Sequence, residues 1–193
     1  MVRSRHDIEE AVAAATELFW SKGFDDTSMQ EVVEATGFNR YALYSSFGSK
    51  RDLFLAALDA YVQLGKSRFE AAFEAEPDSV IAALRHFIHG MIETVADGKA
   101  GCLLCNVATE IAQEDTEIAA RVRGYFDEIE AIFTTVFERA AESGELRAGL
   151  SPALAAKLML NTELGLNTRA RVGADADTLK TAAEATFVAL AAD

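Results

Sequence analysis

Proline is scarce in this chain, which contains only Pro77 and Pro152 among its 193 residues. Proline interrupts helices, whereas alanine, which is abundant here, favours them, so the composition predicts long helices. The only two cysteines, Cys102 and Cys105, are too few for a disulfide framework. No apolar run approaches the roughly 18–20 residues that a membrane-spanning helix needs. The basic N-terminus is not followed by an apolar stretch, so we expect no signal peptide, no membrane partner and a cytoplasmic location.

Basic residues are also few, with 18 Lys and Arg against 31 Asp and Glu and a net charge of -13. This total alone argues against a nucleic-acid partner. Its distribution is uneven, because residues 1–51 hold six basic and eight acidic residues, a net of -2, which leaves -11 for the remainder. The segment from Gly37 to Arg51 contains Arg40 and Lys50 and no acidic residue. We therefore expect one locally cationic face on an acidic body, which suits docking on phosphates by that face.

Half of the residues are hydrophobic, which indicates a folded protein. Their spacing of three to four residues predicts helices almost throughout and no strand. The nine predicted helices cover about 4–22, 28–36, 39–47, a long stretch after Ser49, 79–96, 103–113, 116–142, 151–172 and 175 to the end. We predict an all-α fold in two parts, a three-helix head over residues 1–50 and a sensing and dimerisation body over residues 51–193.

The segment from Thr27 to Phe47 predicts a helix-turn-helix, because two short helices flank a turn that contains Gly37. Overlapping capping boxes pair Thr27 with Gln30 and Ser28 with Glu31 at the start of the first short helix. Asn39 is the expected N-cap of the second. Two such short helices cannot bury their own apolar faces, so the preceding helix must supply the third wall of a small core.

The same region carries a family resemblance. Its motifs are Leu18-Phe19, Lys22-Gly23-Phe24, Thr27-Ser28-Met29, Ala35-Thr36-Gly37, Leu43-Tyr44, Phe47-Gly48-Ser49-Lys50 and Leu53-Phe54. Over these residues the chain closely resembles the TetR family of transcriptional regulators. The later segment Gly101-Cys102-Leu103-Leu104 is a weaker match. The resemblance implies a recognition helix at about residues 39–46 that enters the DNA major groove.

We expect the start of this helix to face the base edges. Arg40 can pair with guanine, and Tyr41 and Tyr44 can offer rings to thymine methyls or hydroxyls to phosphate. The expected backbone contacts are Thr27, Ser28, Ser45, Ser46 and Lys50, of which Lys50 matches the phosphate-contacting lysine of the family.

Several of these residues have alternative structural roles. Asn39, Thr27 and Ser28 are also expected to cap helices, and Tyr44 can instead pack beneath the head. Arg3 and Arg5 can form an arm into the minor groove or a solvated terminus.

The resemblance also implies an effector cavity among the middle helices. The candidate wall residues are Phe87, Met91, Leu104, Phe126, Ile129, Phe133 and Met159, each of which can equally be ordinary core. Polar residues on otherwise apolar helices are more informative candidates, and these are Asn106, Asn161, Glu163 and Asn167.

Two pairs of residues leave further alternatives open. His86 and His89 are three residues apart on a predicted helix, as are Cys102 and Cys105, and together they could supply a tetrahedral zinc set. Alternatively Cys102, at a helix start, is a redox-sensing thiol, or both cysteines are small buried apolar residues. We find no phosphate loop, nucleophile elbow or metalloprotease helix, and we predict neither an enzyme nor a cofactor.

These observations predict a homodimeric repressor that binds a near-palindromic operator and releases it when a small-molecule effector binds. The alternatives are a redox- or metal-responsive regulator, and a helical small-molecule-binding protein without DNA binding. Dimerisation is assigned to the last two helices, 151–172 and 175–192, because both are apolar over a wide arc. On this hypothesis Phe187→Glu should give monomers.

Overall fold

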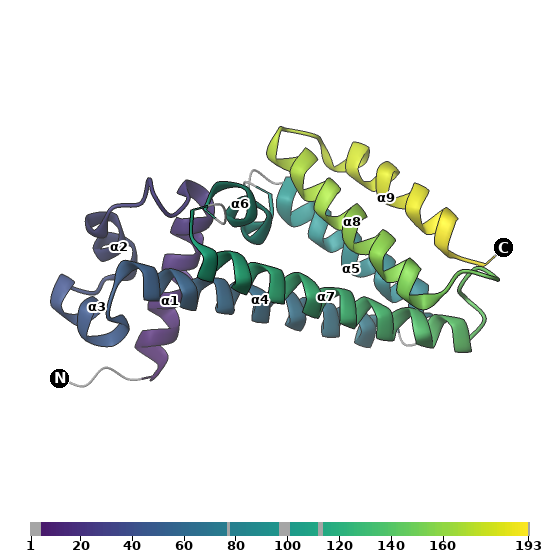
Figure 1. The fold of residues 1–193 in the computed structure, drawn as a ribbon, viewed down its shortest axis with the longest axis horizontal. Helices are drawn as coiled ribbons and strands as arrows, with labels where there is room; N and C mark the ends of the chain where they lie inside the picture. The colour runs from purple at the N-terminus through teal and green to yellow at the C-terminus, as the bar shows by residue number, and fades with distance from the viewer. Residues whose placement is uncertain (1–4, 77, 97–100, 112–113, 193) are drawn as a thin grey trace. The chain divides into compact units, whose positions relative to one another are not determined.

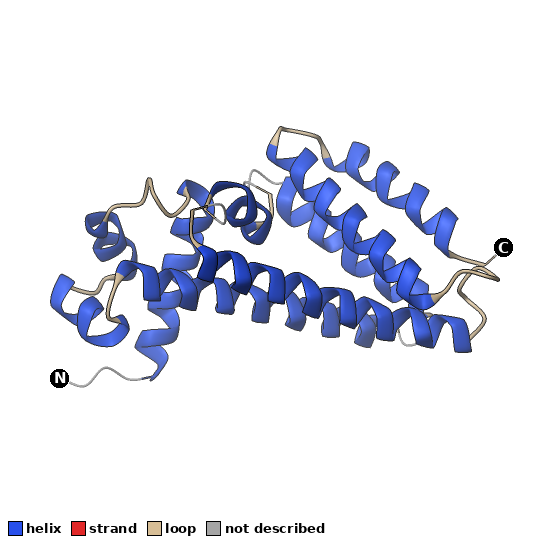
Figure 2. Ribbon diagram, in the orientation of Figure 1, coloured by secondary structure: helices blue, strands red, loops and turns tan. Residues whose placement is uncertain are grey.

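The computed structural model describes residues 5–76, 78–96, 101–111 and 114–192. Within these ranges the chain is α-helical, with nine helices and no strand (Figure 2), and this confirms the predicted all-α class. The helices are α1 (Arg5–Lys22), α2 (Met29–Thr36), α3 (Arg40–Phe47), α4 (Lys50–Ala75), α5 (Val80–Ala96), α6 (Leu103–Glu110), α7 (Thr116–Glu142), α8 (Pro152–Arg171) and α9 (Ala176–Leu190). None of these helices is long and apolar enough to cross a membrane.

The chain forms two compact units, Met1–Gly65 and Lys66–Asp193, which we call the N-terminal and C-terminal units. Helix α4 begins in the first unit and ends in the second (Figure 1). The predicted boundary at residue 50 differs from this division because the first turns of α4 contribute to the N-terminal core. There Phe54 and Leu58 are fully buried.

Three aromatic rings form the centre of the N-terminal unit. The edge of the Phe54 ring meets the Phe19 ring at a centroid distance of 5.1 Å, and Phe24 lies 4.8 Å from Phe54. Helix α2 contributes the buried Val32 and α3 the buried Leu43. These contacts supply the apolar wall that the two short helices lack by themselves.

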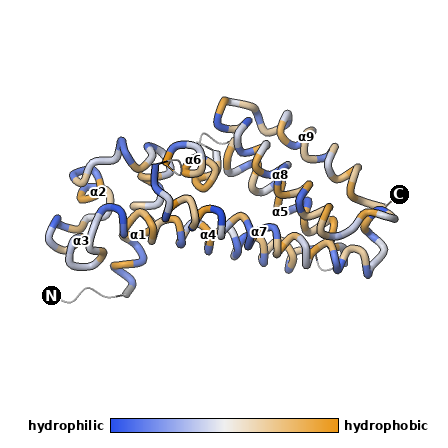
Figure 3. The backbone as a smooth tube through the Cα atoms, in the orientation of Figure 1, coloured by the Kyte–Doolittle hydropathy of each residue, from blue (hydrophilic) through white to orange (hydrophobic). Residues whose placement is uncertain are grey.

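In the C-terminal unit, α5, α7, α8 and α9 pack side by side (Figure 1). Phe133 and Phe137 of α7 and Phe187 of α9 are among the fully buried side chains of their shared core. Hydrophobic and hydrophilic residues alternate along α7, as expected for a helix with one buried side (Figure 3). The short helix α6 packs against α7 and α8.

Glu145, in the connection between α7 and α8, caps the start of α5. Its Oε1 accepts a hydrogen bond from the Val80 backbone N–H at 3.1 Å, and its Oε2 accepts from the Ile81 N–H at 3.1 Å and the Ser79 hydroxyl at 2.5 Å. Partial burial acts to raise the pKa of Glu145, but the bonds from Ser79, Ser143, Ile81 and Val80 outweigh it and lower the pKa to about 2. A carboxylate therefore satisfies helix-terminal N–H groups 64 and 65 residues away.

Candidate nucleic-acid interface and sensor site

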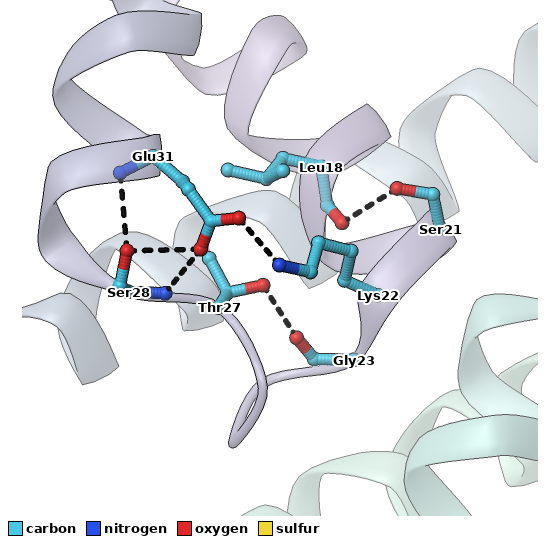
Figure 4. A network of polar contacts seen from close by, with 7 residues as sticks. All are labelled: Leu18, Ser21, Lys22, Gly23, Thr27, Ser28 and Glu31. Carbon is cyan, nitrogen blue, oxygen red and sulfur yellow. Dashed lines mark hydrogen bonds and ion pairs between the residues drawn. The ribbon is translucent and has the colours of Figure 1, made fainter.

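The entry to α2 is fixed by a compact polar network (Figure 4). The Ser28 hydroxyl accepts from the Glu31 N–H at 3.2 Å, while Glu31 Oε2 accepts from the Ser28 N–H at 2.9 Å, which completes a capping box. Lys22, at the end of α1, forms an ion pair with the same carboxylate. The hydrogen bond from Lys22, followed by those from Ser28, lowers the pKa of Glu31 to about 2. The network joins the end of α1 to the start of α2.

Gly37 makes the turn between α2 and α3. Its φ of 68° lies in the left-handed region that residues with a Cβ rarely adopt, and its N–H donates to the Val33 carbonyl at 3.0 Å. Asn39 then caps α3, with its side-chain oxygen accepting from the Ala42 N–H at 2.8 Å. The predicted cap is therefore confirmed.

One side of α3 is exposed and the other is buried. Leu43 is 2% exposed and faces the core, whereas Tyr41 is 83% and Tyr44 42% exposed. Arg40 is also exposed, and its guanidinium carbon lies 6.0 Å from the centroid of the Tyr44 ring. The remaining candidates on this side, Ser45 and Ser46, are exposed as well. The exposed side of α3 therefore offers a cation, two phenol hydroxyls and two serine hydroxyls without an acidic group.

Lys50, at the start of α4, lies over an aromatic ring. Its ammonium nitrogen is 4.3 Å from the centroid of the Phe24 ring, and the residue is half-buried. Burial lowers the pKa of Lys50, and the nearby carboxylates of Asp25, Asp26 and Glu31 oppose that shift. The contact holds the positive charge close to the turn between α3 and α4.

The predicted wall residues of the sensor are buried to different extents. Leu104, Phe133 and Met159 are buried. Those that are only half-buried are Phe87, Met91, Phe126 and Ile129. The edge of the Phe87 ring meets the Phe69 ring of α4 at 5.2 Å, so this aromatic residue takes part in packing. Asn161 is exposed and donates to the Lys157 carbonyl of its own helix at 2.8 Å, which places it away from the interior and overturns its assignment to a cavity wall.

Glu163 and Asn167, one turn apart on α8, form a buried polar site with residues of α5 and α6. The Asn167 amide nitrogen donates to Met91 Sδ of α5 at 3.3 Å and to the Glu163 carbonyl at 3.0 Å. Burial, and to a lesser extent the nearby Cys102 of α6, raises the pKa of Glu163 to about 8. Within the described residues, Glu163 Oε2 and Asn167 Oδ1 are both buried without a hydrogen-bond donor.

Gly101 brings the start of α6 against this part of α8. Its φ is 71°, and a Cβ at this position would lie 2.8 Å from the Asn167 backbone oxygen. Any larger residue would therefore push α6 away from α8.

The cysteine and histidine pairs have separate surroundings. Cys102 is buried and Cys105 half-buried, both are thiols rather than a disulfide, and their side chains are hydrogen-bonded to each other. That bond and burial raise the pKa of the Cys105 thiol. His86 Nδ1 lies 3.6 Å from Glu76 Oε1, and His89 Nε2 lies 3.0 Å from Glu184 Oε1. Among the described residues, no three His, Cys, Asp or Glu side chains are arranged to hold a metal ion, so the four-ligand zinc set is not assembled there.

Comparison with known families covers both units. Residues 11–57 match the family described as "Bacterial regulatory proteins, tetR family", and residues 78–186 match the "Tetracyclin repressor-like, C-terminal domain". The chain belongs to the TetR family. The second match alone spans more than half of the chain, and it runs from the start of α5 into α9, where sequence patterns were least specific.

A curated relative agrees with this membership, and a solved structure has a similar fold. The chain is 31% identical over 169 residues to the uncharacterized HTH-type transcriptional regulator YezE of Bacillus subtilis, covering 86% of this chain and 87% of that protein. It is 35% identical over 115 residues to the HTH-type transcriptional repressor ComR of Escherichia coli, where the match spans 58% of this chain and only 55% of that protein. The fold is similar to that of a cysteine mutant of CifR in complex with 26-bp double-strand operator DNA, at 22% identity, a TM-score of 0.83 and 98% coverage of both chains.

One detail of the TetR-type head differs from expectation. Thr27 is 1% exposed, and its hydroxyl donates to the Gly23 carbonyl at 2.6 Å (Figure 4). A side chain in that position cannot reach a phosphate, so its predicted backbone contact is wrong. Ser28, the other predicted contact at this turn, is exposed. The hypothesis of an N-terminal arm lies outside the described residues, because it concerns Arg3 and the side chain of Arg5.

The assignment of Phe187 to a dimer surface of this TetR-family chain is also wrong. Phe187 is 0% exposed within a single C-terminal unit, and the Arg85 guanidinium carbon lies 4.9 Å from its ring centroid. The exposed large apolar residues of α8 and α9 are Leu154, Leu158 and Val188. Leu154 and Leu158 share one face of α8, and their four-residue spacing was visible in the sequence, but burial had to be known to tell them from Leu160 and Leu166.

Proposed function

We propose that this TetR-family chain is a homodimeric repressor that binds a near-palindromic operator through α3 and releases it when a small molecule binds the C-terminal unit. The observation that carries the proposal is the exposed side of α3, where Arg40 and Tyr41 stand at the start of a capped helix in an acid-free segment. Residues at that end of a recognition helix meet base edges in the major groove. The named repressor among the relatives and the operator complex of CifR support the same function.

In this proposal the residues of the head divide their roles. Arg40 reads guanine, whose O6 and N7 accept both of its N–H groups, and Tyr41 and Tyr44 contact thymine methyls or phosphate. Lys50, Ser28, Ser45 and Ser46 contact the DNA backbone and fix the register of the helix. Asn39 is already engaged in capping α3, which leaves its amide nitrogen as the group that could meet DNA.

The test uses an operator fragment selected from random DNA by the purified protein, with binding followed by fluorescence anisotropy. Arg40→Ala should weaken this complex by ~1–3 kcal/mol and relax the preference for one base pair. Lys50→Ala should weaken binding to all sequences alike and reduce the salt dependence of binding. Arg123→Ala is the control, since Arg123 is an exposed arginine of α7, and it should bind as the wild type does. If Arg40→Ala and Lys50→Ala also bind as the wild type does, the assignment of α3 is wrong.

The dimer surface is proposed on the exposed faces of α8 and α9 around Leu154, Leu158 and Val188. Exposed leucine and valine side chains on two adjacent helices suit a four-helix contact across a two-fold axis. Two heads spaced by one DNA turn, ~34–36 Å, would then read two half-sites. Leu158→Glu should give folded monomers in light scattering that have lost tight operator binding, and a dimer that survives this change would contradict the surface.

The effector releases the operator if it binds more tightly to a dimer conformation whose two heads do not match the half-site spacing. Effector binding then weakens operator binding by thermodynamic linkage. Glu163 and Asn167 of α8 mark the polar part of the proposed site, with the half-buried Met91 and Phe87 of α5 and Ile129 of α7 as apolar neighbours. Titrating candidate small molecules into the operator complex and following anisotropy measures the release directly. Small molecules that bind the protein yet leave the operator complex intact would contradict the proposal that effector binding releases the operator.

A second function is favoured by the contact between Cys102 and Cys105. Because the two thiols are hydrogen-bonded to each other, hydrogen peroxide can oxidise them to a disulfide with release of two water molecules, and this would strain the start of α6. In this redox proposal peroxide lowers operator affinity in the wild type and not in Cys102→Ser. Equal responses of the two proteins would remove the thiols from the mechanism.

A further inference from the structure

Two buried side-chain oxygens on α8 have no hydrogen-bond partner within the described residues. Glu163 Oε2 and Asn167 Oδ1 are both excluded from solvent and receive no hydrogen bond there. The two residues are four positions apart on one helix, so their side chains share a face. A buried acceptor without a donor costs free energy that folded proteins rarely leave uncompensated. The pair is therefore a site at which a missing group is expected.

The orientation of the Asn167 amide is determined by its neighbours. Its nitrogen lies 3.0 Å from the Glu163 carbonyl oxygen, which can only accept, and 3.3 Å from Met91 Sδ, which is a weak acceptor. Exchanging nitrogen and oxygen would place two oxygen acceptors against each other. The side-chain oxygen therefore points away from these contacts, and it requires a donor of its own.

Among the described residues, the surroundings of Glu163 contain thiols and not a cationic side chain. The described group that bears on its carboxyl is Cys102 of α6, and within the described residues Glu163 forms no ion pair. Met91, on the neighbouring α5, adds a thioether, and Phe87 lies one turn before it on the same side of that helix. The site therefore combines two oxygen acceptors, of which one is an acid, with sulfur and an aromatic ring.

From this arrangement we propose that the effector of this protein is a small aromatic or alkyl cation with at least two N–H groups, an amine or amidine, which donates to Glu163 and Asn167 together. This inference rests on the proposed function, since it names the chemical class of its effector. The cation supplies the positive charge that stabilises a buried carboxylate. Its N–H groups satisfy both acceptors, and its apolar part packs against Met91 and Phe87. The raised pKa of Glu163 reflects the absence of that charge in the unliganded protein.

Three compounds of similar shape test the proposal by isothermal titration calorimetry on the full chain without DNA. Benzamidine is a cation with several N–H donors, benzamide is neutral, and benzoate is an anion without donors. We expect benzamidine to bind at least about tenfold more tightly than benzamide, and benzoate to show no binding. Benzamidine that binds no more tightly than benzamide, or fails to bind at millimolar concentration, overturns the proposal.

Variants then locate the binding. Glu163→Gln should reduce benzamidine affinity to the level of benzamide, and Asn167→Ala should weaken both compounds. Glu138→Gln makes the same change at an exposed glutamate of α7 and should leave the affinities unchanged. Circular dichroism melts check that each variant folds, and the three-compound order in the wild type tests the proposal without any variant. Benzamidine affinity that is equal in Glu163→Gln and the wild type would overturn it.

The outcome separates this inference from the proposed function. Benzamidine that binds through Glu163 but leaves the operator complex intact would contradict effector release and leave the ligand class standing. Operator binding that is normal in a protein to which benzamidine does not bind would contradict the ligand class and leave DNA binding standing.

Discussion

The two units of the molecule use their polar side chains at different ranges. In the helix-turn-helix of the N-terminal unit, Ser28 bonds Glu31 three residues away and Lys22 reaches Glu31 nine residues away. In the C-terminal unit, Lys66 pairs with Glu128 across 62 residues and Arg85 with Glu184 across 99. These polar contacts of the helix-turn-helix join residues that are close in sequence, whereas those of the body join helices that meet only after folding. The contrast explains why the caps of the head could be predicted from the sequence, whereas the long-range polar contacts of the body could not.

The two units also differ in where the polar groups of their candidate binding sites lie, which is at the surface in the head and in the interior in the body. The exposed side of α3 presents a cation and hydroxyls to solvent, where water satisfies them until DNA arrives. The body instead buries Glu163 Oε2 and Asn167 Oδ1 away from both water and any described donor. Exposed polar groups cost little stability because water solvates them. Buried polar groups without hydrogen bonds lower the stability of the folded protein because they have lost that hydration.

Phe187→Glu should unfold the C-terminal unit, not dissociate a dimer. It removes a fully buried aromatic side chain and places a charge in the core, and together these should cost more than about 5 kcal/mol. Urea denaturation followed by circular dichroism measures the loss. Val172→Glu is the control, because Val172, at the end of α8, is 83% exposed and lies outside the proposed dimer surface, and it should change the free energy of unfolding by less than about 0.5 kcal/mol. A folded Phe187→Glu protein would contradict the placement of α9.

Glu163→Gln should stabilise the protein increasingly as the pH rises. The folded-state pKa of Glu163 is raised from 4.5 to about 8, so the folded protein holds a proton that the unfolded chain has lost. Wild-type stability should therefore fall relative to the variant by roughly 1.4 kcal/mol for each pH unit between these two values, and level off above them. Urea denaturation at a series of pH values measures the difference. A difference that stays constant with pH would mean that the carboxyl is not buried as described.

Glu145→Ala should destabilise the C-terminal unit by ~1.5–3 kcal/mol, because the carboxylate accepts hydrogen bonds from Val80, Ile81 and Ser79 at the start of α5. Since the pKa of Glu145 is lowered to about 2, this contribution should be complete above pH 4.5 and disappear as the pH falls toward 2. Thermal unfolding at neutral and acidic pH tests both statements. Glu142→Ala, at an exposed position near the end of α7, should have little effect at either pH.

Ser28→Ala should cost about 1 kcal/mol, the usual contribution of an N-cap. The change removes the acceptor of the Glu31 N–H in the head and leaves the body untouched. Hydrogen exchange of α2 amides measures the local loss, and Ser21→Ala is the control, since that hydroxyl only donates to Leu18 within α1. Faster exchange in α2 after Ser28→Ala but not after Ser21→Ala is the expected result, and equal exchange in both would argue against the capping box.

The features that could be predicted from the sequence depend on short-range contacts, and those that could not depend on long-range contacts. The capping box of Ser28 and Glu31, the left-handed Gly37 and the Asn39 cap were all predicted, because each depends on residues within a few positions of one another. Thr27 was misassigned because its burial depends on the docking of the loop after α1 onto the core. Asn161, Glu163 and Asn167 share one helix, yet the sequence could not indicate that the first faces solvent and the other two carry buried acceptors.

The sequence by itself determined the nine helices of the described chain, the helix-turn-helix and its family, because helical periodicity, capping residues and glycine turns act over a few residues. Only the tertiary structure decided that Glu145 caps α5, that Phe187 is core while Leu158 is surface, and that Glu163 and Asn167 lie beside Met91 and Cys102. These outcomes depend on which faces of α5, α6, α8 and α9 meet. An apolar or polar residue on a helix has the same local pattern whether it faces a neighbouring helix, a partner or water, and only packing distinguishes the three.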